Sequence, residues 1–123
     1  MRNILLIDSD LGFVFWLGHI LSGAGFEALP AKSVADAIAL LSMLAIQIDL
    51  LIFNPYVEGA VNFAADLKRA DRHLKTMAVV PEEMPVELSG VDASKGKINR
   101  FDVPARDEWL SFIQRLLSNT KTA

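Results

Sequence analysis

The chain has 123 residues, of which 52% are hydrophobic, and its formal net charge is −3. This length suits one domain with one core, and the apolar fraction argues against disorder. The lack of a basic excess argues against a nucleic-acid partner, and no apolar run approaches the ~20 residues of a membrane span. The N-terminus shows no signal-peptide pattern, so we expect a cytoplasmic protein. Without cysteine, and with only His19 and His73, both expected on solvated helix surfaces, no metal centre is predicted.

Apolar runs and segments with helical spacing alternate along the chain. Strands are predicted at residues 4–7, 26–29, 49–54, 76–80 and 97–103. Helices are predicted at 11–22, 33–44, 59–75 and 107–117, with a weaker one at 86–94. This alternation predicts one α/β domain over residues 1–118, followed by a frayed tail at 119–123. The expected architecture is a doubly wound, five-stranded parallel sheet with helices on both faces and the flavodoxin-like strand order 2-1-3-4-5.

Three residues are predicted to mark where these helices begin or a strand ends. Asp10 and Ser33 precede helical segments and carry short acceptor side chains, so each is expected to cap the helix that follows. Pro30 follows the second predicted strand and has no backbone N–H, which restricts that strand to an edge of the sheet or ends it there.

The first predicted helix carries five consecutive apolar residues at positions 13–17. A one-sided buried stripe accounts for Phe13, Trp16 and Leu17 and leaves Val14 and Phe15 pointing away. Exposed aromatic surface often marks a contact site, so Phe15, with Val14 and Trp16, is a candidate interface with a partner or a second copy. The alternative is a single exposed aromatic above a broad buried face.

The segment at residues 49–54 places a polar residue, Asn54, directly after the apolar run 50–53. Open α/β folds place their chemistry at the carboxyl ends of such buried strands. Asn54 also precedes Pro55, where asparagine is common as a turn residue, and we favour this structural interpretation.

Several pieces of the sequence, taken in order, resemble the receiver domains of bacterial two-component response regulators. They are Ile4 to Asp10, Gly25-Phe26, Asp49 to Phe53, and Val103-Pro104 ahead of an amphipathic helix. The resemblance implies a phosphoryl-accepting aspartate after the third strand and acidic Mg²⁺ ligands after the first. It also implies a Ser or Thr at the end of the fourth strand and a Lys at the end of the fifth. Such a site neutralises the charge that spreads over the transferring phosphoryl oxygens.

The sequence departs from that pattern at the positions that carry chemistry. Asp8 is retained, but Ser9 replaces the second acidic residue, and Asp10, one step along, is expected to be a helix cap. The aspartate is replaced by Asn54, the hydroxyl position falls at Val80 or Pro81, and the lysine position falls at Val103. We therefore predict a degenerate receiver: a non-enzymatic interaction or regulatory module without a cofactor, in which Asp8 is at most a weak metal ligand.

Two other functions remain open at this stage. An enzyme or small-ligand binder could use Asp8, Ser9, Asn54 and Tyr56 on the same scaffold, although no glycine-rich phosphate loop follows the first strand. A residual phosphoacceptor at Asp8, Ser9 or Asp10 is disfavoured, because those side chains belong to the cation position. The expected partner is a protein: a signalling kinase, an output domain or a second copy. The resemblance implies that the last helix and the strand before it form one such surface.

Overall fold

The computed structural model describes residues 2–81, 90–97 and 103–118 of the chain. Within these ranges, five parallel strands form one sheet in the order β2-β1-β3-β4-β5. The strands are β1 (Asn3–Ile7), β2 (Glu27–Ala31), β3 (Leu50–Phe53), β4 (Lys75–Val80) and β5 (Ala93–Gly96). The helices are α1 (Leu11–Gly23), α2 (Val34–Leu44), α3 (Ala60–Ala70) and α4 (Val103–Ser118). The predicted α/β class and strand order are confirmed.

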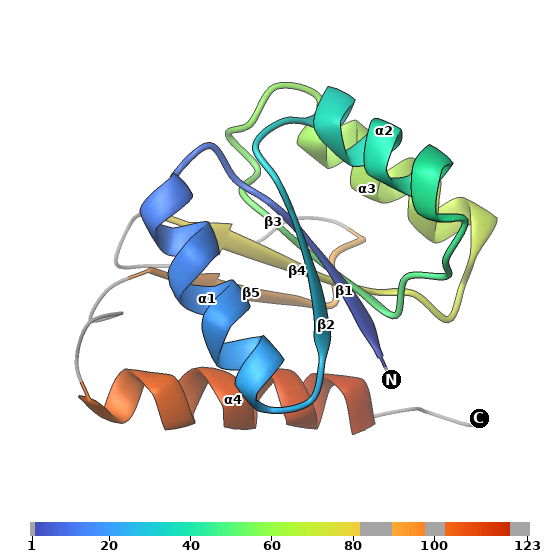
Figure 1. Cartoon of the computed structure of the whole chain (residues 1–123). Helices are drawn as coiled ribbons and strands as arrows, with labels where there is room; N and C mark the ends of the chain where they lie inside the picture. Colours follow the sequence, from blue (N-terminus) through green and yellow to red (C-terminus); the bar gives the residue numbers. More distant parts are fainter. Residues whose placement is uncertain (1, 82–89, 98–102, 119–123) are drawn as a thin grey trace.

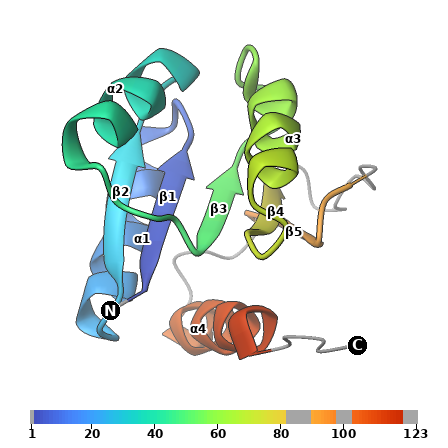
Figure 2. The same cartoon turned by 90° about the vertical axis from the view of Figure 1, so that its right-hand side faces the viewer.

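The helices form two layers around the sheet, with α1 and α4 on one face and α2 and α3 on the other (Figures 1 and 2). Alternation along the central strands divides the core between these layers. Ile4 and Leu6 of β1 pack toward α1 and α4, whereas Leu5 and Ile7 pack toward α2 and α3. Because β1 and β3 are covered on both faces, the sequence shows them as continuous apolar runs.

The predicted helix caps are both present. The Asp10 carboxylate accepts a hydrogen bond from the Phe13 N–H at 3.1 Å, and the Ser33 hydroxyl accepts one from the Asp36 N–H at 3.1 Å. Each bond satisfies a backbone donor that the first helical turn leaves free. Pro30 lies in β2, which is an edge strand, as its missing N–H requires.

The prediction for the fifth strand was wrong. β5 spans Ala93–Gly96, and Val103 begins α4 instead of ending a strand. Residues 98–102 lie outside the described residues, as do residues 86–89 of the predicted weak helix and the tail at 119–123. Pairing with β4, which places Met77 beside Ala93 and Val80 beside Gly96, positions β5 despite its polar sequence. An edge strand needs little apolar content. Lys95 of β5 also covers two aromatic rings, because its Nζ lies 5.2 Å from the ring centroid of Trp109 and 5.4 Å from that of Phe112.

The first helix buries a broader face than the predicted stripe. Val14 is 2% exposed, so its expected place on the surface was wrong. Trp16 is partly buried and meets the edge of Trp109, with ring centroids 5.8 Å apart. Phe15 is 65% exposed, which confirms this part of the prediction. The face is broad because α1 packs against both the sheet and α4. None of the helices within the described residues has the length and apolar character that crossing a bilayer requires.

Candidate functional site

Asp8 and Asn54 lie side by side at the carboxyl ends of the two central strands. The β1–β3 register pairs Ile7 with Phe53, so the residues that follow them are neighbours. The Asn54 Nδ2 donates to Asp8 Oδ1 at 3.4 Å, and the two residues are only 8% and 2% exposed. The polar site that the sequence predicted at this edge therefore has two of its members in contact.

The Asn54 side chain also organises the turn after β3. Its Oδ1 accepts a hydrogen bond from the Tyr56 N–H at 2.9 Å, and its backbone carbonyl accepts one from the Val57 N–H at 3.0 Å. The Tyr56 contact is an Asx-type turn, which asparagine forms readily ahead of a proline. The structure thus supports the interpretation of Asn54 as a turn residue and adds a buried contact to Asp8.

Lys97, which the sequence analysis missed, completes the site. It follows β5 directly, and its N–H donates to the Val80 carbonyl at 2.9 Å, which holds it beside the end of β4. Its Nζ lies 2.6 Å from Asp8 Oδ2, 3.4 Å from Asp10 Oδ2 and 4.6 Å from the centroid of the Phe13 ring. Lys97 is 8% exposed, so its charge is buried beside that of Asp8, whereas the Asp10 side chain is 38% exposed. The sequence offered one weak signal for the position of Lys97. Side chains two residues apart in a strand lie on the same face of the sheet, so Lys97 is expected on the face of Lys95.

The two oxygens of the Asp8 carboxylate have different kinds of partner. Its Oδ1 accepts from the Asp10 N–H at 2.9 Å and from the Asn54 amide, whereas no aligned hydrogen bond reaches Oδ2 within the described residues. The contact of Oδ2 with Lys97 is therefore an ion pair held by charge and proximity. A buried carboxylate requires such a counter-ion, because transfer of an isolated charge out of water is costly.

The remaining predicted site residues lie around this cluster or away from it. Val80 ends β4 and is fully buried, Pro81 after it is exposed, and Ser9 is exposed beside the buried Asp8. Val103 belongs to α4, so the lysine position inferred there was wrong. The interface candidates Val14, Phe15 and Trp16 lie on α1.

The residues present are a poor fit to Mg²⁺, which the resemblance implies. Over the described ranges, no cluster of three or more His, Asp or Glu side chains could hold a metal ion. Mg²⁺ requires several oxygen ligands in octahedral geometry, and here the Lys97 ammonium already lies against Asp8 Oδ2. A cation would have to displace that ammonium to reach the buried carboxylate.

No protein-family model matches the chain, and no curated protein is similar to it in sequence. Solved structures match it over almost its full length. A response regulator from Thermotoga maritima superimposes with a TM-score of 0.78 at 16% identity, covering 97% of this chain and 99% of that one. The non-phosphorylated HemR receiver domain from Leptospira biflexa gives 0.74 at 19% identity, covering 100% and 99%. The chain has the fold of a response-regulator receiver.

A third response regulator gives a similar match. The response regulator TrrA from Thermotoga maritima, solved in complex with Mg²⁺-BeF, superimposes with a TM-score of 0.71 at 20% identity, covering 94% of this chain and 99% of that one. In this chain Lys97 directly follows β5, and its ammonium lies 2.6 Å from Asp8 Oδ2. Asn54 directly follows β3, and Val80 ends β4.

Proposed function

We propose that this chain is a receiver-type module of two-component signalling that acts without aspartyl phosphorylation, through contacts with protein partners. The observation that carries the proposal is the amide of Asn54 at the end of β3, in contact with Asp8 at 3.4 Å. An amide oxygen is neutral, and its nitrogen lone pair is delocalised, so neither atom can attack phosphorus as a carboxylate does.

The surrounding groups support the same conclusion. Phosphoryl transfer needs positive charge that is free to bind the transferring oxygens. Here the Lys97 ammonium lies between the carboxylates of Asp8 and Asp10, and Val80 offers no hydroxyl at the end of β4. The one ammonium of the cluster is thus already engaged by two carboxylates, as expected of a structural site rather than a reactive one.

A direct test is incubation of the full chain with a small-molecule phosphodonor and Mg²⁺, followed by intact-mass measurement. We expect no phosphoryl adduct under conditions that fully label an active receiver run in parallel. A labile adduct on the wild-type chain would overturn the proposal. Peptide mapping would then show whether Asp8 or Asp10 had served as a residual acceptor.

A module of this kind transmits information through its binding equilibria. Without a phosphoryl switch, its state depends on the concentration of a partner, whether a signalling kinase, an output domain or another receiver. The strand-end cluster then keeps the carboxyl edge of the sheet in one conformation, since Lys97, Asp8 and Asn54 link β5, β1 and β3.

A further inference from the structure

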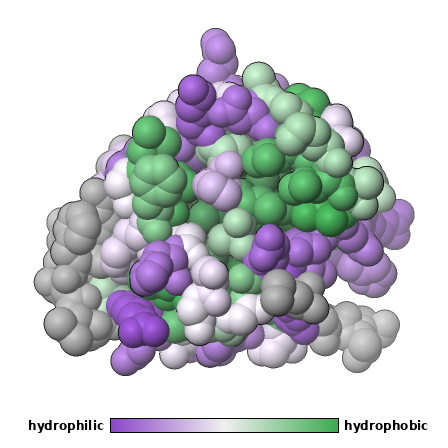
Figure 3. All heavy atoms as spheres, in the orientation of Figure 1, coloured by the Kyte–Doolittle hydropathy of each residue, from purple (hydrophilic) through white to green (hydrophobic). Residues whose placement is uncertain are grey.

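A hollow of about 520 Å³ opens between α1 and the start of α4. Its volume falls within the range of small-molecule pockets, roughly 300–1,000 Å³. Five residues of α1 and one of α4 line it: Phe15, Trp16, His19, Ile20, Gly23 and Arg106. Figure 3 shows hydrophobic surface over the start of α1 and hydrophilic surface below it, toward α4. The lining therefore combines an apolar part with a polar part, as a site for an amphipathic molecule requires.

The apolar wall of this hollow is held in place by the core. Trp16 is partly buried, and the centroid of its ring lies 6.2 Å from that of Phe13 and 5.8 Å from that of Trp109, which it meets edge-on. Ile20 is 5% exposed, whereas Phe15 is 65% exposed and adds a second aromatic ring to the lining. Because two neighbouring rings fix Trp16, an aromatic ligand can pack against it without reorganising the wall.

The charge at the hollow is positive and is not neutralised by the protein. Among the lining residues that the structure describes, only Arg106 is formally charged, and over the described ranges its guanidinium forms no ion pair. The opposite wall, α1, carries no acidic side chain between Leu11 and Gly23. On α4, Asp107 and Glu108 follow Arg106 directly, and helix positions one and two apart do not face each other. The guanidinium is therefore available to an anion.

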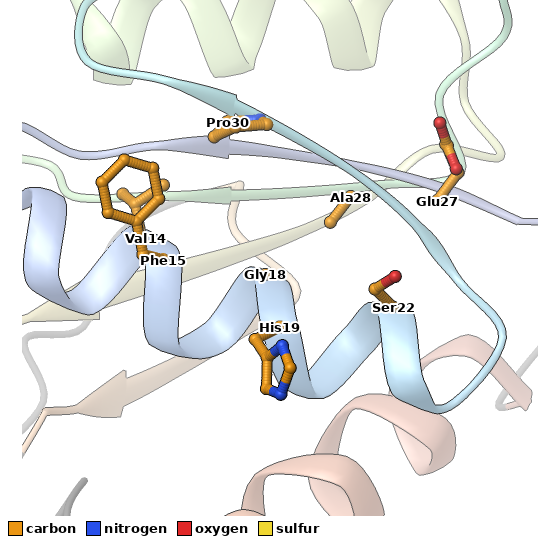
Figure 4. Close-up of a pocket in the computed structure, with 8 residues that line it drawn as sticks. All are labelled: Val14, Phe15, Gly18, His19, Ser22, Glu27, Ala28 and Pro30. Carbon is orange, nitrogen blue, oxygen red and sulfur yellow. The ribbon is translucent and has the colours of Figure 1, made fainter.

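His19 supplies a second donor. Its ring points away from β2, on the side of α1 that faces α4 (Figure 4). A neutral imidazole carries one ring N–H and a protonated one carries two, so His19 can donate to a carboxylate in either form. A smaller hollow of about 330 Å³ between α1 and β2 also includes Phe15 and His19, but Glu27 lines it and would repel an anion (Figure 4). Charge complementarity thus favours the hollow beside α4.

We propose that the hollow between α1 and α4 binds a small aromatic carboxylate. The carboxylate is bound by Arg106 and His19, and the ring system packs against Trp16 and Phe15. A guanidinium can bind a carboxylate through two parallel hydrogen bonds, which selects this anion by shape as well as charge. At about 30 Å³ for each water-sized group, the hollow holds roughly 15 non-hydrogen atoms, the size of a two-ring acid. The site does not use the strand-end cluster, so its test is independent of the phosphodonor test.

Titration of the full chain with naphthaleneacetate, followed by NMR, tests the site. The chain has two tryptophans, and the indole N–H signal of Trp16 should shift more than that of Trp109, which is 1% exposed. We expect a saturable shift with a Kd of about 1 mM or below. Naphthaleneacetamide has the same shape without the charge, so its Kd should be about fivefold higher or more.

Three variants separate the anionic head from the aromatic body. Arg106→Gln should raise the Kd of the acid about fivefold or more and leave that of the amide within about twofold. Phe15→Ala should raise both Kd values by a similar factor, roughly threefold, because either ligand loses the same apolar contact. Arg72→Gln removes an exposed charge outside the hollow and should change neither. All three altered side chains are exposed, so the ligand-free variants should keep the NMR spectrum of the folded chain.

Three results would overturn the proposal. The first is the absence of a saturable shift at ~5 mM naphthaleneacetate. The second is equal affinity for the acid and the amide, which would assign the hollow to an uncharged ligand or to an apolar side chain of a partner protein. The third is a preference for the acid that Arg106→Gln leaves intact, since the carboxylate would then be bound elsewhere on the chain.

Discussion

The Nζ of Lys97 lies 2.6 Å from Oδ2 of Asp8, and both side chains are more than nine-tenths buried. This ion pair joins the end of β5 to the end of β1, across the two strands that lie between them in the sheet. The ammonium is further held against Asp10 and the Phe13 ring of α1. The Lys97 ammonium thus acts as a fixed counter-ion for Asp8.

Removal of this counter-ion should be costly. Lys97→Met keeps most of the aliphatic side chain and leaves the Asp8 carboxylate buried without a partner charge, which typically costs about 3–5 kcal/mol in the free energy of unfolding. Urea denaturation measures this loss. Lys95→Met is the matched control, because within the described part of the chain the Lys95 ammonium contacts only the rings of Trp109 and Phe112, and such cation–π contacts contribute about 1 kcal/mol.

The double variant separates charge from packing. If the unpaired charge causes the loss, Asp8→Asn combined with Lys97→Met should recover much of it, because no isolated charge then remains. A double variant as unstable as Lys97→Met alone would show that Lys97 contributes by packing instead.

Asn54→Asp should also destabilise the chain and should not restore phosphorylation. The new carboxylate would lie beside Asp8, where two negative charges would share one ammonium and the amide hydrogen bond would be lost. We expect a loss of about 1–3 kcal/mol at neutral pH. The like charge raises the pKa of the new carboxyl in the folded state, so the loss should shrink as the pH falls toward its unfolded value of about 4.

Phosphodonor treatment of the same variant is the second measurement. We expect no adduct, since Ser9 offers no carboxylate, Val80 offers no hydroxyl, and Lys97 already binds Asp8. Efficient Mg²⁺-dependent labelling of Asn54→Asp would show that a single residue separates this site from an active receiver.

Continuous apolar runs were enough to predict the centre of the fold. β1 and β3 are buried on both faces, so hydrophobicity alone identifies them, and Asp10 and Ser33 mark helix starts through a local hydrogen bond. β5 gave no such signal, because an edge strand is positioned by pairing with β4 rather than by its own polar sequence.

The candidate site was only half predictable for a related reason. Asp8 and Asn54 each follow an apolar strand, and the parallel topology then places them together. The contact between Lys97 and Asp8 joins residues 89 positions apart and depends on where β5 ends, which the sequence placed wrongly. Val14 was misplaced because a helical stripe shows the direction of burial, whereas its width depends on how the neighbouring α4 packs.

Asp92 makes a pH-dependent contribution far from this site. Burial raises the pKa of its carboxyl, but the Lys68 ammonium at 2.7 Å and the Thr76 donors outweigh burial and hold the pKa below its ordinary value of 3.8. A lowered folded-state pKa means that the carboxylate stabilises the fold above about pH 4 and that this contribution is lost as the pH falls through the folded value. Asp92→Asn should therefore cost about 1 kcal/mol at neutral pH, a modest value because water screens the pair.

The difference in the free energy of unfolding between wild type and Asp92→Asn should disappear at acidic pH. Thermal or urea unfolding at several pH values measures it, and the two stability curves should converge below about pH 4. Asp66→Asn is the control, because Asp66 pairs with Arg69 on the exposed face of α3, where such pairs contribute at most about 0.5 kcal/mol. A difference that stayed constant with pH would mean that the charge of Asp92 is not what stabilises the contact.

The end of α2 offers a stabilising substitution. Ala45 caps this helix with φ 50, in the left-handed region, and its N–H donates to the Leu41 carbonyl at 3.2 Å. A left-handed alanine costs about 1–2 kcal/mol relative to glycine, part of which is offset by the greater freedom of glycine in the unfolded chain. Ala45→Gly should therefore raise the free energy of unfolding by about 0.5–1 kcal/mol, measured by urea denaturation.

The end of α1 supplies the reciprocal experiment. Gly25 has φ 91, and open space surrounds the position that a Cβ would occupy, so Gly25→Ala would introduce backbone strain without a steric clash. It should lower stability by about 1 kcal/mol or more. Gly23→Ala is the matched control, because Gly23 also faces open space but lies within α1 without a positive φ, and alanine there should be neutral or stabilising. Equal effects of the two substitutions would show that backbone strain does not govern this helix end.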